Sequence, residues 1–157
     1  MVAILSPKIL PEIRMSVDEY LRADFPEGYR YELVEGVVEM TPAPAPSHDR
    51  PLHPLHGAIY SYWQDHPRAF GHISQRAAVV IPRRSTVREP DLALYREWPD
   101  EDESWSAWKR IKPFWVAEIV SKARRQRDYR DKRREYWRAG IEEYWIVDTI
   151  ERRITAR

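Results

Sequence analysis

The chain has 157 residues, the usual length of one domain and enough to bury a core without cross-links. Hydrophobic residues make up 43% of it and charged residues 32%, which excludes a wholly disordered chain, and a net charge of +1 excludes a histone-like binder. Cysteine is absent, which excludes disulfides and thiolate metal sites, and no apolar run reaches the roughly 20 residues of a membrane span. We therefore expect a single cytoplasmic domain over residues 1–157 with no membrane partner.

The N-terminal part is predicted to contain an arm, a short helix and a β-hairpin. Residues 1–14 form the arm, and Ser16-Val-Asp-Glu then matches a capping box, so a helix should begin there. Residues 29–40 contain two β-rich runs on either side of Glu35-Gly36, a turn pair, which predicts the hairpin.

A proline-rich segment follows the hairpin. Five prolines within residues 41–54 argue against a helix or a central strand there, so we predict a helix that starts at Pro54. The apolar face of that helix would comprise Leu55, Ala58, Ile59 and Tyr62. Three histidines occur here without a recognised zinc spacing and are interpreted as surface residues; they are His48, His53 and His56.

The rest of the chain alternates between apolar runs and one strong helix pattern. The apolar runs are predicted to be strands and cover residues 77–81, 91–95, 114–120, 144–148 and 152–155. An acidic, tryptophan-rich excursion occupies residues 97–112, and a helix should span 124–139 and end at Gly140. This order predicts an α/β (α+β) protein with helices packed on a mixed sheet.

Two carboxylates stand out because they occur in apolar strand sequences. Asp91 opens Asp-Leu-Ala-Leu-Tyr, and Glu118 lies within Val-Ala-Glu-Ile-Val. A buried carboxylate needs a cation, a metal ion or a basic side chain to offset its desolvation. A structural ion pair with an arginine is the alternative interpretation, because such pairs also occur in cores.

The helix after these strands offers a basic partner. Lys132 shares a stripe with Tyr129 and Tyr136, at spacings i, i+3 and i+7. We expect Tyr136 and Trp137 to face the core, which would direct Lys132 inward, and a compact ammonium suits a buried site. A solvated lysine is the alternative, because Arg133 also lies one turn from Tyr129.

Four motifs in the second half of the chain carry a family resemblance. They are Glu-Pro-Asp-Leu-Ala-Leu (89–94), Val-Ala-Glu-Ile-Val-Ser (116–121), Arg-Asp-Tyr-Arg-Asp-Lys (127–132) and Tyr-Trp-Arg-Ala-Gly-Ile-Glu-Glu-Tyr-Trp-Ile-Val-Asp (136–148). Together with the hairpin and Ser47-His48, they resemble the Uma-type putative restriction endonuclease family of the PD-(D/E)xK nuclease superfamily. The resemblance implies a restriction-endonuclease-like mixed central sheet flanked by helices, with an N-terminal β-hairpin.

The resemblance also implies a reaction and roles for four residues. Asp91 and Glu118 would hold Mg²⁺, with Mn²⁺ as a substitute, and the metal would activate a water against a DNA phosphodiester. Lys132 would orient that water or stabilise charge on the phosphate. Glu32 would supply an upstream acid, although two other glutamates of the hairpin compete for this role.

The chain departs from the superfamily pattern at the lysine. The usual lysine lies two residues after the second acid, where this chain has Val120. The family places the lysine on the following helix, which favours Lys132, while Lys122 is a rival four residues after Glu118. Extra prolines after His48 leave the role of that histidine open.

The charge distribution bears on the partner. Residues 122–138 contain nine basic and three acidic side chains, which favours contact with DNA phosphates, a solvated helix face being the alternative. The first hypothesis is therefore a Mg²⁺-dependent DNA endonuclease that acts as a homo-oligomer, a dimer or higher. The second is a non-catalytic nucleic-acid-binding or assembly module with the same fold, because aromatic residues suit an interface. A domain with only structural ion pairs is the third.

Overall fold

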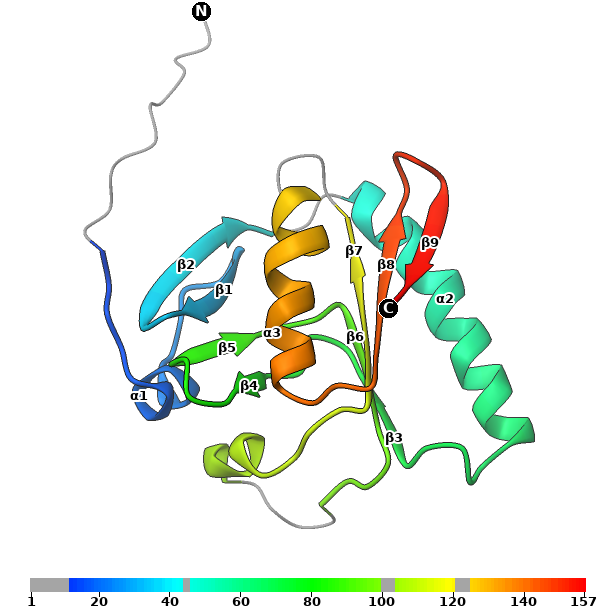
Figure 1. Cartoon of the computed structure of the whole chain (residues 1–157), viewed down its shortest axis with the longest axis horizontal. Coiled ribbons are helices and arrows are strands. Elements are labelled where there is room, and N and C mark those ends of the chain that lie inside the picture. Colours follow the sequence, from blue (N-terminus) through cyan, green and yellow to red (C-terminus); the bar gives the residue numbers. More distant parts are fainter. Residues whose placement is uncertain (1–11, 44–45, 100–103, 121–124) are drawn as a thin grey trace, which may run out of the picture.

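The computed structural model describes residues 12–43, 46–99, 104–120 and 125–157 (Figure 1). It contains two sheets, one of four strands in the order β2-β1-β5-β4 and one of five in the order β3-β6-β7-β8-β9. The strands are β1 (Tyr29–Val34), β2 (Val37–Pro42), β3 (His72–Ser74), β4 (Val79–Ile81), β5 (Thr86–Arg88), β6 (Leu92–Tyr95), β7 (Trp115–Ile119), β8 (Glu143–Asp148) and β9 (Arg153–Ala156). The helices are α1 (Val17–Arg22), α2 (Pro46–Asp65), the 3₁₀-helix η1 (Trp105–Lys109), the π-helix η3 (Arg127–Lys132) and α3 (Arg133–Arg138).

The first sheet is antiparallel and contains the predicted hairpin. β1 and β2 pair from Tyr29↔Pro42 to Val34↔Val37. The two turn residues have positive φ angles, 50° at Glu35 and 82° at Gly36, as in the tight turns that match strand twist. α1 packs against this sheet and begins with the predicted capping box at Ser16, so the predicted helix and hairpin are confirmed. Residues 1–11 of the predicted arm lie outside the described residues.

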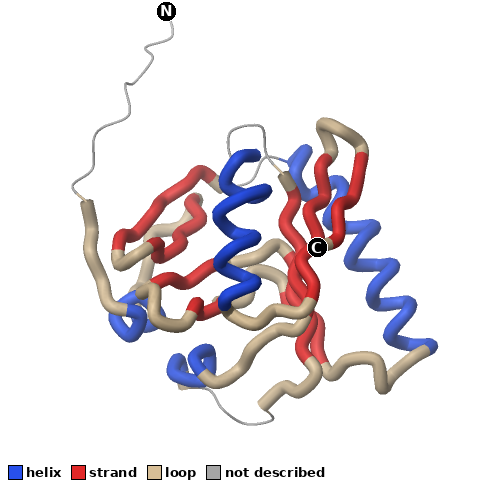
Figure 2. Tube along the Cα trace, viewed as in Figure 1, coloured by secondary structure: helices blue, strands red, loops and turns tan. Residues whose placement is uncertain are grey.

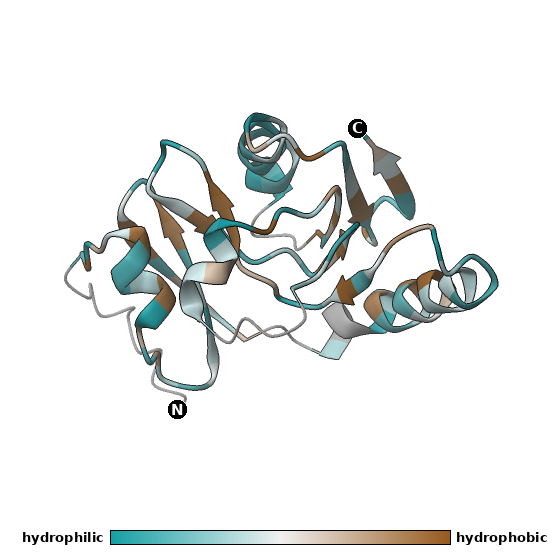
Figure 3. Ribbon diagram, turned by 90° about the horizontal axis from the view of Figure 1, so that it is seen from below, coloured by the Kyte–Doolittle hydropathy of each residue, from teal (hydrophilic) through white to brown (hydrophobic). Residues whose placement is uncertain are grey.

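The second sheet is mixed and lies between two helical layers. β7 pairs with β6 antiparallel and with β8 parallel. One face of this sheet packs on α3, and the opposite face packs on α2 (Figures 1 and 3). Alternation along β7 explains this arrangement, because Val116 belongs to the core on the α3 side while Trp115 and Ala117 belong to the core on the α2 side.

The prediction for the proline-rich segment is wrong. α2 begins at Pro46 rather than at Pro54 and contains Pro51 and Pro54 within it. Each internal proline removes a backbone donor, and apolar packing of the helix on the sheet offsets that loss. The packed residues are Leu52, Leu55, Ile59 and Trp63. Two members of the predicted face, Ala58 and Tyr62, are exposed instead.

The C-terminal helix follows its predicted course with one change inside it. Residues 127–132 form a π-helix before α3 continues, and Gly140 follows the end with a φ of 73°. Tyr136 is fully buried, as predicted, but Trp137 is 77% exposed. Successive residues of an α-helix point about 100° apart, so the two cannot both face the core. The ribbon of this helix is largely hydrophilic in Figure 3.

Two short strands, β3 and β5, were not among the predicted elements, since each is three residues long. In the sequence they are too short to show a clear alternation. Residues 75–78, 82–85 and 89–91 connect them to the neighbouring strands, and Figure 2 colours such connections as loops. Among the described helices, none has both the length and the apolar character required to cross a membrane.

Candidate active site

The four predicted site residues come from four elements and are all buried. Glu32 is on β1, Asp91 directly precedes β6, Glu118 is on β7 and Lys132 ends η3. Their exposed fractions are 7%, 3%, 3% and 4% in the same order. Lys132 lies on the side of the helix that faces β7, where it bonds to Glu118, and it points inward as predicted.

Lys132 lies among three carboxylates. Its Nζ atom donates to Oε1 of Glu118 at 2.7 Å and lies 3.2 Å from Oε1 of Glu32. The third carboxylate belongs to Asp128, one turn earlier in the helix, with its Oδ1 3.9 Å from Nζ. Glu118 also accepts a 2.6 Å hydrogen bond from the buried hydroxyl of Tyr136. The structure thus joins three of the four predicted residues in one hydrogen-bonded cluster.

Asp91 adjoins this cluster but has a different basic partner. Its Oδ1 accepts from Nη1 of Arg30 at 2.7 Å, and its Oδ2 accepts from the backbone N–H of Ile119 at 2.7 Å. Arg30 also donates to the carbonyl oxygen of Glu89 at 2.8 Å. The bond to Ile119 fixes Asp91 beside the residue that follows Glu118 on the neighbouring strand.

Two further arginines surround Glu32. Nη1 of Arg88 is 3.1 Å from Oε2 of Glu32, and the same guanidinium makes two bonds to Glu135, at 2.6 and 2.9 Å. Nη2 of Arg127 lies 3.3 Å from Glu32, and its Nη1 pairs with Glu39. These pairs connect the hairpin to the helix through charges that are buried or partly buried.

The two glutamates of the cluster have opposite pKa shifts. Burial raises the pKa of Glu118 to about 7, against the attraction of Lys132, and the negative charges of Asp91 and Asp128 add to the rise. Burial also acts on Glu32, but the cations around it outweigh that effect and lower its pKa to about 2. One cluster therefore contains an acid that holds its proton readily and one that is ionised at any ordinary pH.

Some residues of the cluster were not predicted as site residues. Arg30 lies two positions before Glu32 on a strand, which puts both on one face, and this spacing was the available signal. Asp128 precedes Lys132 by four residues, another spacing that shares a face. Tyr136 was predicted as a core residue only. Lys122 and the side chain of His48 lie outside the described residues.

The cluster contains the oxygen donors that a divalent cation prefers, but these donors are not yet arranged as a cation site. Its buried members comprise four acids (Glu32, Asp91, Glu118, Asp128) and three bases (Arg30, Arg88, Lys132). The carboxylate oxygens are the hard donors that Mg²⁺ prefers, and the surplus acid together with the raised pKa of Glu118 indicates room for more positive charge. Within the described ranges, however, no three acidic or histidine side chains are already grouped as metal ligands.

Comparisons with known proteins bear on the fold and the family. A crystal structure described as a putative nuclease belonging to DUF820, from Anabaena variabilis ATCC 29413, superposes with a TM-score of 0.69. The two sequences are 18% identical, and the match covers 91% of this chain and 79% of the other, so the chain has a restriction-endonuclease-like fold.

A comparison of the sequence with family models identifies the family. The family Uma2, described as putative restriction endonuclease, matches residues 17–156. The chain therefore belongs to the Uma2 family. A search among curated proteins gives no match.

Proposed function

We propose that the protein is a Mg²⁺-dependent endonuclease that hydrolyses phosphodiester bonds in DNA. The observation that carries the proposal is the contact of one buried lysine, Lys132, with both Glu118 and Glu32, in a member of a putative restriction endonuclease family. Asp91 directly precedes β6 and is bonded to the residue after Glu118 on the adjacent strand β7, which brings the two acids close together.

Asp91 and Glu118 are the proposed ligands of Mg²⁺, or of Mn²⁺ in its place. When bound, the cation would lower the pKa of a water and offset negative charge on the phosphate. The high pKa of Glu118 supports the assignment, because a carboxyl group short of positive charge gains most from a cation. Arg30 would hold the Asp91 carboxylate in place through its 2.7 Å bond.

Lys132 is the proposed positioning group for the attacking water and the phosphate. Its ammonium has three donors, of which Glu118 and Glu32 engage two, and a fixed ammonium beside the phosphate would stabilise its growing negative charge. In the reaction, the water oxygen bonds to phosphorus as the water gives up a proton to solvent, the bridging phosphorus–oxygen bond breaks, and the leaving oxygen takes a proton from solvent. Glu32, ionised by its cations, would keep Lys132 charged and oriented.

One observation favours the second hypothesis, a binding or assembly module that retains the fold. Both carboxylate oxygens of Asp91 already accept hydrogen bonds, from Arg30 and from Ile119. If Arg30 stays bound to Asp91 under all conditions, the acid serves the fold and not a cation. Cleaving both strands would also require two copies of this single site, so the nuclease hypothesis includes a homo-oligomer, which sedimentation can measure.

Plasmid cleavage in Mg²⁺ or Mn²⁺ tests the proposal. Wild-type protein should cleave, and Asp91→Asn, Glu118→Gln and Lys132→Met should each lose at least about 100-fold in rate, since each removes a charge from the site. Glu35→Gln is the matched control, because this exposed hairpin glutamate pairs with Arg84 away from the cluster. Circular dichroism verifies folding, and an RNA of the same sequence tests the choice of substrate.

Two results would decide against the proposal. Metal-stimulated cleavage that survives both Asp91→Asn and Glu118→Gln would place the activity elsewhere. Absence of cleavage in either metal, together with metal-independent DNA binding, would favour the binding module.

A further inference from the structure

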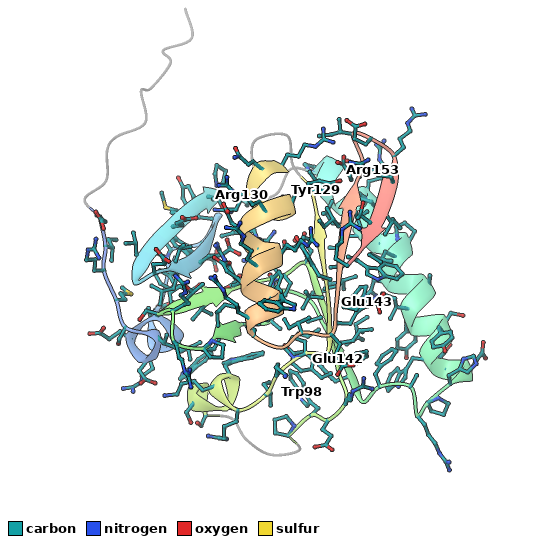
Figure 4. All side chains as sticks on the ribbon, in the orientation of Figure 1. Trp98, Tyr129, Arg130, Glu142, Glu143 and Arg153 are labelled. Carbon is teal, nitrogen blue, oxygen red and sulfur yellow. The ribbon has the colours of Figure 1, made fainter. Side chains whose placement is uncertain are left out.

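A pocket of about 500 Å³ lies beside the C-terminal helix, and none of the four predicted site residues lines it. It is lined by the helix, by the start of β8 and by the last residue of the chain. Figure 4 labels Tyr129 and Arg130 toward one end of the helix and Glu142 beside its other end, so the pocket follows the helix axis. Four of its nine lining residues are arginines: Arg130, Arg133, Arg134 and Arg157.

The positive charge in this pocket is largely uncompensated. Across the described residues, neither Arg133 nor Arg134 forms an ion pair, and both are exposed. The acid at the pocket edge, Glu142, already pairs with Arg96 at 2.6 Å, and Arg130 pairs with its exposed neighbour Asp131. Free guanidinium groups in a hollow suit a phosphate, which they can bind through two parallel hydrogen bonds.

The same pocket presents an aromatic platform. Trp137 is 77% exposed, and the lining also contains Tyr129, which is half-buried, and Tyr144, which is 3% exposed. Both tyrosines are anchored from behind, because the hydroxyl of Tyr129 donates to Asp148 at 2.9 Å and that of Tyr144 donates to the carbonyl oxygen of Asp128 at 2.9 Å. A rigid wall with one open indole is suited to stacking a planar ring.

We propose that this pocket binds an unpaired nucleotide of a nucleic acid strand, with the base stacked on Trp137 and the phosphate held by Arg133 and Arg134. Stacking on an aromatic side chain beside basic groups is how proteins bind single strands without reading their sequence, and a base inside a duplex offers no free face. This inference rests on the proposed function in one respect. If the protein cleaves duplex DNA, the pocket makes a duplex with a single-stranded flank its preferred substrate.

Binding without metal tests the pocket separately from cleavage. In EDTA, fluorescence anisotropy compares a labelled single-stranded oligonucleotide with a blunt duplex. The wild type should prefer the single strand, and Trp137→Ala should bind it about tenfold more weakly, the usual loss for one stacked base. Trp105→Ala is the matched control, since Trp105 is 61% exposed on η1 and outside this pocket, and it should bind like the wild type.

A salt titration tests the phosphate contact. Between about 50 and about 200 mM salt, Arg133→Gln should reduce the slope of log affinity against log salt by about 0.7, the amount expected for one contact to a single strand. Arg22→Gln, which removes an exposed arginine on α1, should leave the slope unchanged.

The outcomes separate the two proposals. Equal affinity of the wild type and Trp137→Ala for the single strand, or no binding by either, overturns the pocket even if plasmid is cleaved. Loss of binding in Trp137→Ala supports the pocket even if no metal gives cleavage, in which case the proposed function fails alone. If Trp137→Ala instead changes the mass measured by light scattering and leaves oligonucleotide binding intact, the pocket is a contact between two copies of the chain.

Discussion

The two sides of the C-terminal helix differ in whether their charged side chains are buried and paired or exposed and unpaired. On the inner side, Lys132 is 4% exposed and lies within ion-pairing distance of three carboxylates. On the outer side, Arg133 and Arg134 are exposed, and no described side chain forms an ion pair with them. Burial makes an unpaired charge costly, whereas solvent tolerates it, so the inner charges pair with one another and these two outer arginines do not.

This difference explains how a chain with a net charge of +1 can contact nucleic acid. In the described part of the chain, five of its 25 acidic residues are buried but only three of its 26 basic residues, so the sum of charges understates the basic character of the surface. It also implies opposite consequences for substitutions. Inner substitutions should mainly change stability and catalysis, and outer ones should mainly change binding.

The largest expected effect on stability comes from the inner side. Arg88 is 1% exposed and connects Glu32 of β1 with Glu135 of α3. Arg88→Met should lower the free energy of unfolding by about 3–5 kcal/mol, because two carboxylates lose a buried partner. Urea denaturation followed by circular dichroism measures the loss.

The control for this substitution is a surface pair of the same types. Arg84 and Glu35 lie 2.9 Å apart with side chains 44% and 67% exposed, and Arg84→Met should cost no more than about 1 kcal/mol. Equal losses for the two variants would break the distinction between inner and outer charges.

The inner site could be predicted in part because its members leave local signals. Asp91 and Glu118 stood out as acids in apolar strands, and the helical spacing of Lys132 indicated its direction. The pairing of Arg30 with Asp91 joins residues 61 positions apart, and no local pattern encodes such a contact. The catalytic roles of these residues remain predictions.

The fold, too, could be predicted only where neighbouring residues determine the structure. The hairpin and its turn follow from neighbouring residues and were correctly predicted. The start of α2 was not correctly predicted. The prolines disfavour a helix locally, but packing of α2 on the sheet stabilises the helix from Pro46 onward. The prediction that Trp137 faces the core is wrong. Its aromatic side chain favours burial, but its position directly after the buried Tyr136 turns it toward solvent.

The second largest expected effect is a dependence of stability on pH, and it comes from Glu118 on the inner side. An acid with a higher pKa in the folded state binds its proton more tightly when folded, so stability falls as the pH rises from the ordinary value of 4.5 to about 7. For Glu118 alone this amounts to roughly 3 kcal/mol. The low pKa of Glu32 acts in the opposite sense below pH 4.5, so the two ranges do not overlap.

Glu118→Gln isolates this contribution. In EDTA, urea denaturation of the variant at several pH values should show a flatter profile than the wild type between pH about 4.5 and about 7. Glu35→Gln should keep the wild-type profile. Parallel profiles for the wild type and Glu118→Gln would mean that Glu118 is already ionised throughout this range and that the inner cluster has enough positive charge without a metal ion.

The smallest expected effect on stability comes from the outer side. Trp137→Ala and Arg133→Gln should each change the free energy of unfolding by less than about 0.5 kcal/mol in urea, because both side chains are exposed and neither belongs to a described core or ion pair. A loss of several kcal/mol in Trp137→Ala would mean that the indole is covered in solution, most simply by a second copy of the chain. A negligible loss combined with weaker oligonucleotide binding would separate the two sides of the helix completely, since the same element would then supply folding energy through one face and ligand contacts through the other.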